Sequence, residues 1–156
     1  MMKLSLMRWL LQGVPECLAI ATFSWMLLGR QFNARKILSI GLLQALAAYF
    51  VRLLPVSFGI HTLILVFSLA ALLVYFSSGS YSRVLSVSLV TFVVLGLLEL
   101  VIFALSSSLF NLTAEAILAD PLLSVLMGLP GVALLFLGAF LLAGLKRKIK
   151  GIFKVT

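Results

Sequence analysis

The sequence predicts an all-α fold, a polytopic membrane bundle of about five transmembrane helices, and three observations support this. Of the 156 residues, 63% are hydrophobic and only 10% are charged, with a mean hydropathy of +1.28. Soluble domains carry about 25% charged residues, and a domain this small cannot bury so much apolar surface in its own core. Apolar runs of roughly 20 residues, enough to cross a bilayer as a helix, alternate with short connectors flanked by basic residues.

Each apolar run is expected to be a helix, because every backbone polar group in lipid must be paired within its own segment. The predicted spans are, in order, Leu4 or Trp9 to Leu28, Ile37–Leu54, Ile60–Phe76, Val84–Leu105 and Leu122–Leu145. They form one bundle over residues 1–145, which a basic tail over 146–156 follows. Whether residues 1–12 cross the membrane stays open.

The connectors contain residues that end helices. Residues 30–36 (RQFNARK) predict a polar turn, Pro55 and Gly59 separate the second and third spans, and residues 77–82 (SSGSYS) predict a Ser/Gly turn. The longer connector, 106–121, is predicted to contain a short interfacial helix that begins at Thr113, runs through Leu118 and is ended by Pro121, because threonine is a favoured N-cap.

Small and cyclic residues within the spans predict local features. Pro15 and Pro130 are expected to bend their helices, because proline removes a backbone donor. Gly128, Gly131 and Gly138 predict close helix contacts along the fifth span, since small residues let neighbouring backbones approach.

Basic residues predict the orientation, because cytoplasmic loops carry an excess of Lys and Arg. With five spans, most of the basic residues fall on one side: Arg30, Arg35, Lys36, Arg83, Lys146, Arg147, Lys148, Lys150 and Lys154. Glu115 and Asp120 fall on the other side, and Lys3 and Arg8 oppose the assignment. We therefore expect a multi-pass protein of the cell membrane with a cytoplasmic C-terminus and an extracytoplasmic N-terminus.

The net charge of +8 bears on the expected partners. The basic residues flank apolar runs and no recognition motif accompanies them, so we expect no nucleic acid partner. The expected partners are the lipid bilayer, other membrane proteins or a second copy in a homodimer, and a cytoplasmic partner at the basic tail. Cys17 is the single cysteine and no His or Cys spacing fits a metal site, so neither a metal nor a cofactor is expected.

Six polar residues within the spans need an explanation, because a charge near the bilayer centre costs about 3 kcal/mol or more. They are Gln12, Glu16, Gln44, Arg52, His61 and Glu99. The topology places the four ionisable ones in the outer half of the membrane, on four different helices. Gln12 and Glu16 are four residues apart and share a helix face.

The other helices show a similar alignment. Gln44, Ala48 and Arg52 are spaced by four and form one stripe. Gly96 and Glu99 share a face, which predicts close approach of a neighbouring helix. Since an arginine keeps its proton, we expect a buried network in which Arg52 pairs with Glu16, Glu99 or both.

Such a network has several interpretations. It could only fix the helix register, or Arg52 could simply extend its side chain to the membrane surface. Alternatively, it is a ligand or ion site open to the outside. A proton relay is a further interpretation, although no polar residues continue inward toward Arg83.

Four stretches resemble the N-terminal membrane domain of Gram-positive sensor histidine kinases of the accessory-gene-regulator type and their stand-alone relatives. They are residues 13–16 (GVPE), 49–62 (YFVRLLPVSFGIHT), 97–100 (LLEL) and 128–141 (GLPGVALLFLGAFL). The resemblance implies an outward-facing sensing bundle, often dimeric, whose motions pass to a cytoplasmic kinase. The sequence departs from that family because it ends at Thr156 without the dimerisation helix, the phosphorylated histidine or the ATP-binding domain. We therefore expect a lone receptor, a decoy or an accessory subunit.

No nucleophile elbow, phosphate-binding loop or zinc motif is present, so we expect the chain not to be an enzyme. The first hypothesis is a sensory or regulatory membrane module that binds a small ligand or peptide at the polar residues. The second is a small accessory or structural subunit of a larger membrane complex. The third is a small transporter component, which the lack of an internal repeat disfavours.

Overall fold

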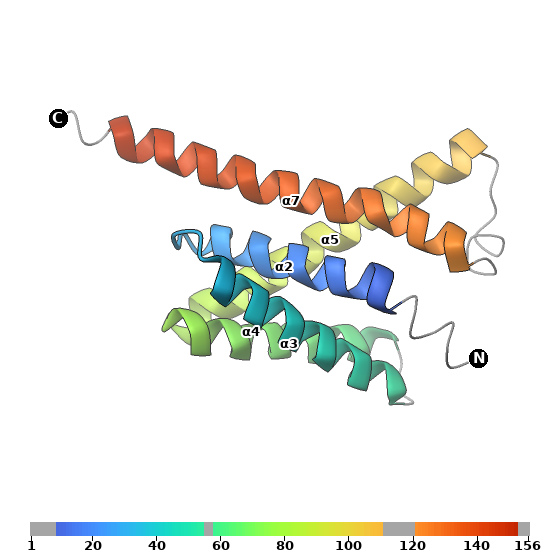
Figure 1. Ribbon diagram of the computed structural model, residues 1–156, viewed down its shortest axis with the longest axis horizontal. Helices are drawn as coiled ribbons and strands as arrows, with labels where there is room; N and C mark the ends of the chain where they lie inside the picture. Colours follow the sequence, from blue (N-terminus) through green and yellow to red (C-terminus); the bar gives the residue numbers. More distant parts are fainter. Residues whose placement is uncertain (1–8, 55–57, 111–120, 153–156) are drawn as a thin grey trace.

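A computed structural model describes residues 9–54, 58–110 and 121–152. Within these residues the elements are a π-helical segment, η1, and the α-helices α2, α3, α4, α5 and α7 (Figure 1). Their bounds are Trp9–Gly13, Val14–Leu27, Ala34–Leu53, Phe58–Ser77, Tyr81–Phe110 and Pro121–Ile152. The short helix predicted from Thr113 to Leu118 lies outside the described residues, as do Lys3, Arg8 and residues 1–8 as a whole.

The predicted fold class is confirmed: the protein is an all-α bundle in which five helices are long and apolar enough to span a membrane. Successive helices run up and down, so the two chain termini lie at opposite ends of the bundle (Figure 1). This alternation agrees with an odd number of spans.

Most helices begin earlier or end later than the apolar runs predicted. Helix α3 begins at Ala34 and not at Ile37, because the Asn33 side chain accepts a hydrogen bond from the Lys36 backbone N–H at 3.2 Å and caps the helix. Helix α5 begins at Tyr81, inside the predicted Ser/Gly turn. Local capping and polar first turns therefore extend helices beyond the apolar segment that crosses the lipid.

Three prolines lie in the described helices. Pro15 lies in the first turn of α2, directly after the π-helical segment, where a missing N–H is tolerated. Pro121 begins α7, as prolines often do at a first helical position, and the segment before it, where the sequence predicts the short helix, lies outside the described residues. Helix α7 continues through Pro130 and on to Ile152, so the residues 146–152 continue the last helix.

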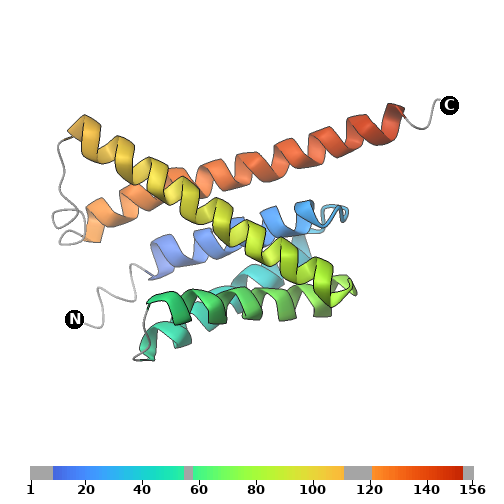
Figure 2. The same ribbon diagram turned by 180° about the vertical axis from the view of Figure 1, so that it is seen from behind.

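Helix α2 lies at the centre of the bundle. It packs against α3, α5 and α7, while α3 packs on α4, α4 on α5, and α5 on α7. Helix α5 crosses the bundle diagonally, so that its C-terminal end lies away from α3 and α4 (Figure 2). The helices therefore pack closely at one end of the bundle and diverge at the other.

The main core surrounds the second half of α2. Its buried members include Ile20 and Trp25 of α2, Ile40 of α3, Leu69 of α4 and Leu135 of α7. A smaller cluster of Cys17, Ala45 and Ala48 lies nearer the start of α2. Most of the tight packing is therefore in the half of the bundle where α2 ends.

Small residues let the central helices approach closely. A Cβ atom at Gly41 of α3 would lie 3.0 Å from the Leu18 Cα of α2. A Cβ at Gly131 would lie 3.3 Å from Ile102, and one at Gly138 would lie 3.3 Å from Phe23. The close contacts predicted along the fifth span are confirmed at these glycines, whereas the Gly41 contact was not predicted.

Candidate ligand site

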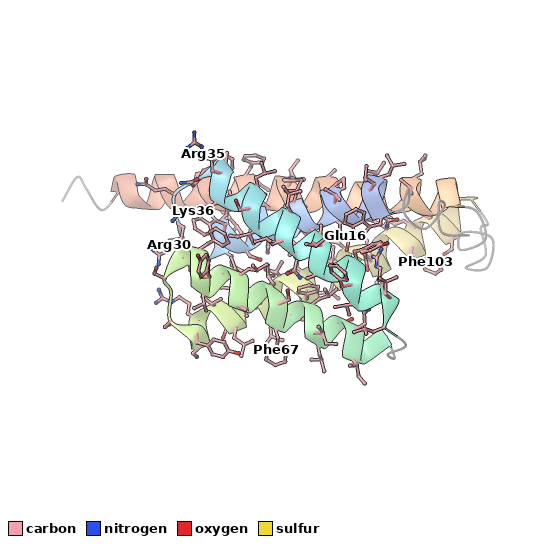
Figure 3. All side chains as sticks on the ribbon, turned by 60° about the horizontal axis from the view of Figure 1, so that its bottom comes forward. Glu16, Arg30, Arg35, Lys36, Phe67 and Phe103 are labelled. Atoms are coloured by element: carbon pink, nitrogen blue, oxygen red, sulfur yellow. The ribbon has the colours of Figure 1, made fainter. Side chains whose placement is uncertain are left out.

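The two ends of the bundle differ in charge. We call the end where α2 ends and α3 begins the basic end, because Arg30, Arg35 and Lys36 lie there (Figure 3). We call the opposite end, where α2 begins, the cluster end. It carries Glu16, Arg52, His61 and Glu99, which we call the mixed-charge cluster.

Four helices contribute one residue each to the mixed-charge cluster. Glu16 lies near the start of α2, which continues directly from η1. Arg52 lies in the last turn of α3, where the dipole favours a cation. His61 lies in the first turn of α4, and Glu99 lies in the half of α5 that departs from α4. The four residues therefore come from four helices, with Arg52 at the end of α3, His61 at the start of α4 and Glu99 within α5.

The cluster residues are close enough to interact electrostatically. Glu16 lies within range of both Glu99 and Arg52. Arg52 in turn lies within range of Glu99 and His61. The structure therefore brings the four ionisable side chains of the predicted site into one neighbourhood.

The predicted direct pairing of Arg52 with Glu16 or Glu99 is not formed. Among the described residues, no carboxylate oxygen lies within 4.0 Å of the Arg52 guanidinium. Arg52 and Glu99 are exposed on the surface of the bundle, while Glu16 and His61 are half-buried. The cluster is therefore open at its edge and is not the closed, buried network that the sequence predicted.

Gln44, predicted as part of a ligand-binding or structural polar network, lies between α3 and α4. It is buried, and its amide nitrogen donates to the Leu65 carbonyl of α4 at 3.0 Å. The Ser68 hydroxyl donates to its amide oxygen at 3.1 Å. Both sides of the amide are thus occupied, so Gln44 joins α3 to α4 and is not available to a ligand. The stripe of Gln44, Ala48 and Arg52 is buried only at its first two members.

Gln12 lies against α7. A Cβ atom at Gly128 would overlap the Gln12 side chain, so the glycine provides the space that the amide fills. Gln12 is half-buried and lies in the π-helical segment before α2. It therefore contacts the fifth span rather than sharing in the charge interactions of Glu16.

The helix approach predicted at Gly96 is absent. No described atom lies within 4 Å of the position that a Cβ would occupy there. The neighbouring Leu97 and Leu100 are 57% and 65% exposed. The divergence of α5 from α4 leaves this face without an intramolecular neighbour.

One group of residues beside the cluster is not apparent from the sequence. The Trp9 indole donates to the Ala45 carbonyl at 3.0 Å, and its ring lies 5.2 Å from that of Tyr49. These aromatic side chains join η1 to α3 beside the small cluster of Cys17, Ala45 and Ala48. Trp9 and Tyr49 are 40 positions apart in the sequence, so no local pattern indicates that they meet.

The chemistry available in the cluster is charge recognition. The guanidinium can bind a carboxylate or phosphate through two parallel hydrogen bonds, and the carboxylates can accept hydrogen bonds from an amine. Among the described residues, no group of three or more His, Cys, Asp and Glu side chains could hold a metal ion.

Comparisons with family models, with curated proteins and with solved structures found no match to this chain. The resemblance to the membrane domain of sensor kinases therefore stays a prediction from the sequence.

Proposed function

We propose that this chain is a non-catalytic sensory or regulatory membrane module that binds a small ligand or short peptide at the mixed-charge cluster. One observation supports this above the others: Arg52 and Glu99 are both exposed on helices that span the membrane, and neither forms an ion pair within the described chain. A charge held in this way at the edge of the lipid is costly unless a partner or water solvates it.

The surroundings of Arg52 favour a ligand with both kinds of charge. Arg52 provides a cation, and Glu16 and Glu99 provide carboxylates within electrostatic range of it. A zwitterionic molecule, such as a short peptide with free termini, would complement both. The Lys and Arg bias of the connectors would place the cluster on the extracytoplasmic side of the cell membrane.

The experiment is a thermal unfolding screen of the purified protein in mild detergent against short peptides with free termini. A ligand at 100 times its Kd stabilises the native state by about 2.7 kcal/mol. We expect a peptide that raises the Tm of the wild type and loses its effect on Arg52→Gln and on Glu99→Gln. Arg35→Gln, at the basic end, is the control that should keep the response. Peptides that raise the Tm of all variants equally would contradict the proposal.

A second candidate function is an accessory subunit of a larger membrane complex. The exposed face of α5 around Gly96 favours it, because no described helix lies against Gly96 and the nearby Leu97 and Leu100 are exposed. A native pull-down in mild detergent tests this. Stoichiometric membrane proteins that are lost on Gly96→Leu would support the accessory role, whereas purification of the chain alone would contradict it.

A further inference from the structure

The basic end carries cations on three separate segments. Arg30 lies in the connector between α2 and α3, Arg35 and Lys36 lie in the first turn of α3, and Arg83 lies in the first turn of α5. All four side chains are exposed. Figure 3 shows Arg30, Arg35 and Lys36 at the same end of the molecule.

Helix α7 brings further basic residues to this end. Its membrane-spanning part ends at Leu145, and the helix continues to Ile152 through a segment of sequence KRKIKGI (146–152). In Figure 1 this part of α7 extends past the end of the bundle where α2 ends and α3 begins.

The segments that carry these cations contain no acidic residue. The chain has four acidic residues, which are Glu16, Glu99, Glu115 and Asp120. None of them lies in the connectors 28–33 and 78–80, in the first turns of α3 and α5, or in residues 146–152. These segments therefore carry cations with no acidic residue among them.

Two of the cations have a structural role. Arg30 donates to the Ser77 carbonyl at 2.6 Å, and Lys36 donates to the Phe76 carbonyl at 3.1 Å. Both bonds satisfy carbonyls at the C-terminal end of α4, where helices have unpaired acceptors and the dipole favours cations. Lys36 also lies 5.7 Å from the centre of the Trp25 ring.

Arg35 and Arg83 have no such role. Neither side chain forms a hydrogen bond or an ion pair with another described residue. Both lie in first turns of helices, where the dipole disfavours a cation. The stability of the helices therefore does not explain their positions.

The depth and surroundings of these arginines fit a lipid headgroup. Each lies within two residues of the start of a membrane-spanning helix. Tyr75 and Tyr81 are 80% and 56% exposed near the same end, and tyrosine is enriched at the membrane–water interface. A guanidinium binds phosphate oxygens through paired hydrogen bonds.

We propose that the basic end is a binding surface for anionic phospholipids, in which Arg35 and Arg83 contact the headgroup phosphate and Arg30 and Lys36 hold the helix ends beside them. A lipid surface fits better than a soluble acidic partner, because the cations lie at the end of a bundle whose sides carry exposed apolar side chains. This inference concerns the opposite end from the mixed-charge cluster and is independent of the proposed function.

The test uses the full chain reconstituted into vesicles of phosphatidylcholine and phosphatidylglycerol in equal parts. The protein is re-extracted in mild detergent, and the retained lipids are quantified by mass spectrometry. We expect phosphatidylglycerol to be enriched over phosphatidylcholine, and Arg35→Gln and Arg83→Gln each to lower this enrichment about fivefold, the effect of one basic residue near an anionic surface.

The matched control is Arg52→Gln, which removes the same charge at the cluster end and should keep the enrichment. Thermal unfolding of each variant verifies that it is folded. The proposal is overturned if Arg35→Gln and Arg83→Gln retain phosphatidylglycerol like the wild type, or if Arg52→Gln lowers it equally. A competition with soluble polyglutamate tests for an acidic protein partner. The proposal is also overturned if polyglutamate at low concentration displaces the lipid from the wild type but not from Arg35→Gln.

Discussion

The basic end and the cluster end of this bundle are built from the same helices but in different ways. Toward the basic end, residues 19–26 of α2 are all buried, and the cations of the connector and of α3 bond to the carbonyl end of α4. Toward the cluster end, α5 diverges, Gly96 has no neighbour, and the charged residues Arg52 and Glu99 are exposed. Packing and capping thus stabilise one end, while the other leaves charged side chains exposed.

The largest effect is expected where the central helices approach most closely. Gly41→Leu should destabilise the protein by about 1–3 kcal/mol, because the new side chain would displace Leu18 and separate α3 from α2. Unfolding by SDS in mixed micelles measures the change. Gly96→Leu is the matched control at the diverging face and should cause no loss of stability. Equal losses for the two variants would show that the two regions do not differ in packing.

The hydrogen bonds between α3 and α4 should have a smaller effect. Gln44→Leu removes the bonds to the Leu65 carbonyl and the Ser68 hydroxyl, and we expect a loss of about 1 kcal/mol in the same unfolding assay. Ser68→Ala removes only one of these bonds and should cost about half as much. If Gln44→Leu altered ligand binding but not stability, the structural role assigned to Gln44 would be wrong.

A hydroxyl pair between α2 and α5 should contribute less again. Ser24 and Thr91 are fully buried, and their hydroxyl oxygens lie 2.9 Å apart. A double-mutant cycle of Ser24→Ala and Thr91→Val should give a coupling energy of about 0.6 kcal/mol, the average found for hydrogen bonds between membrane helices. A coupling energy of zero would mean that each hydroxyl bonds only to its own helix, as Thr91 also does to the Val87 carbonyl at 2.8 Å.

The smallest effect on stability is expected at the mixed-charge cluster. Arg52→Gln and Glu99→Gln should each change the free energy of unfolding by no more than about 0.5 kcal/mol, because both side chains are exposed and neither forms an ion pair with another described residue. The double variant should then be additive. A strong coupling between the two substitutions would reveal an ion pair in solution and would favour a purely structural cluster.

The sequence was a good guide to the helices and a partial guide to the site. All five spans are present within a few residues of their predicted limits, and Glu16, Arg52, His61 and Glu99 do lie near one another. Gln44 and Gln12 were placed with them because they share helical faces with Arg52 and Glu16. In the structure, Gln44 contacts α4 and Gln12 contacts α7. The sequence could not predict these contacts, because residues on one helix face share a direction but do not show which helix lies opposite.

The number of helices, their up-and-down order and the excess of basic residues at one end could be predicted from the sequence alone. These follow from the length of the apolar runs and from the positions of the ionisable residues, since lipid requires each segment to satisfy its own backbone. The packing of the helices was needed to show which helix is central, that α5 diverges from α4, and that Arg52 forms no ion pair with another described residue. These features depend on how the helices rotate about their axes and cross one another. The packing of small residues such as Gly41 against Leu18 sets this geometry. The sequence pattern of a single helix does not contain it, because it does not show which helix lies opposite.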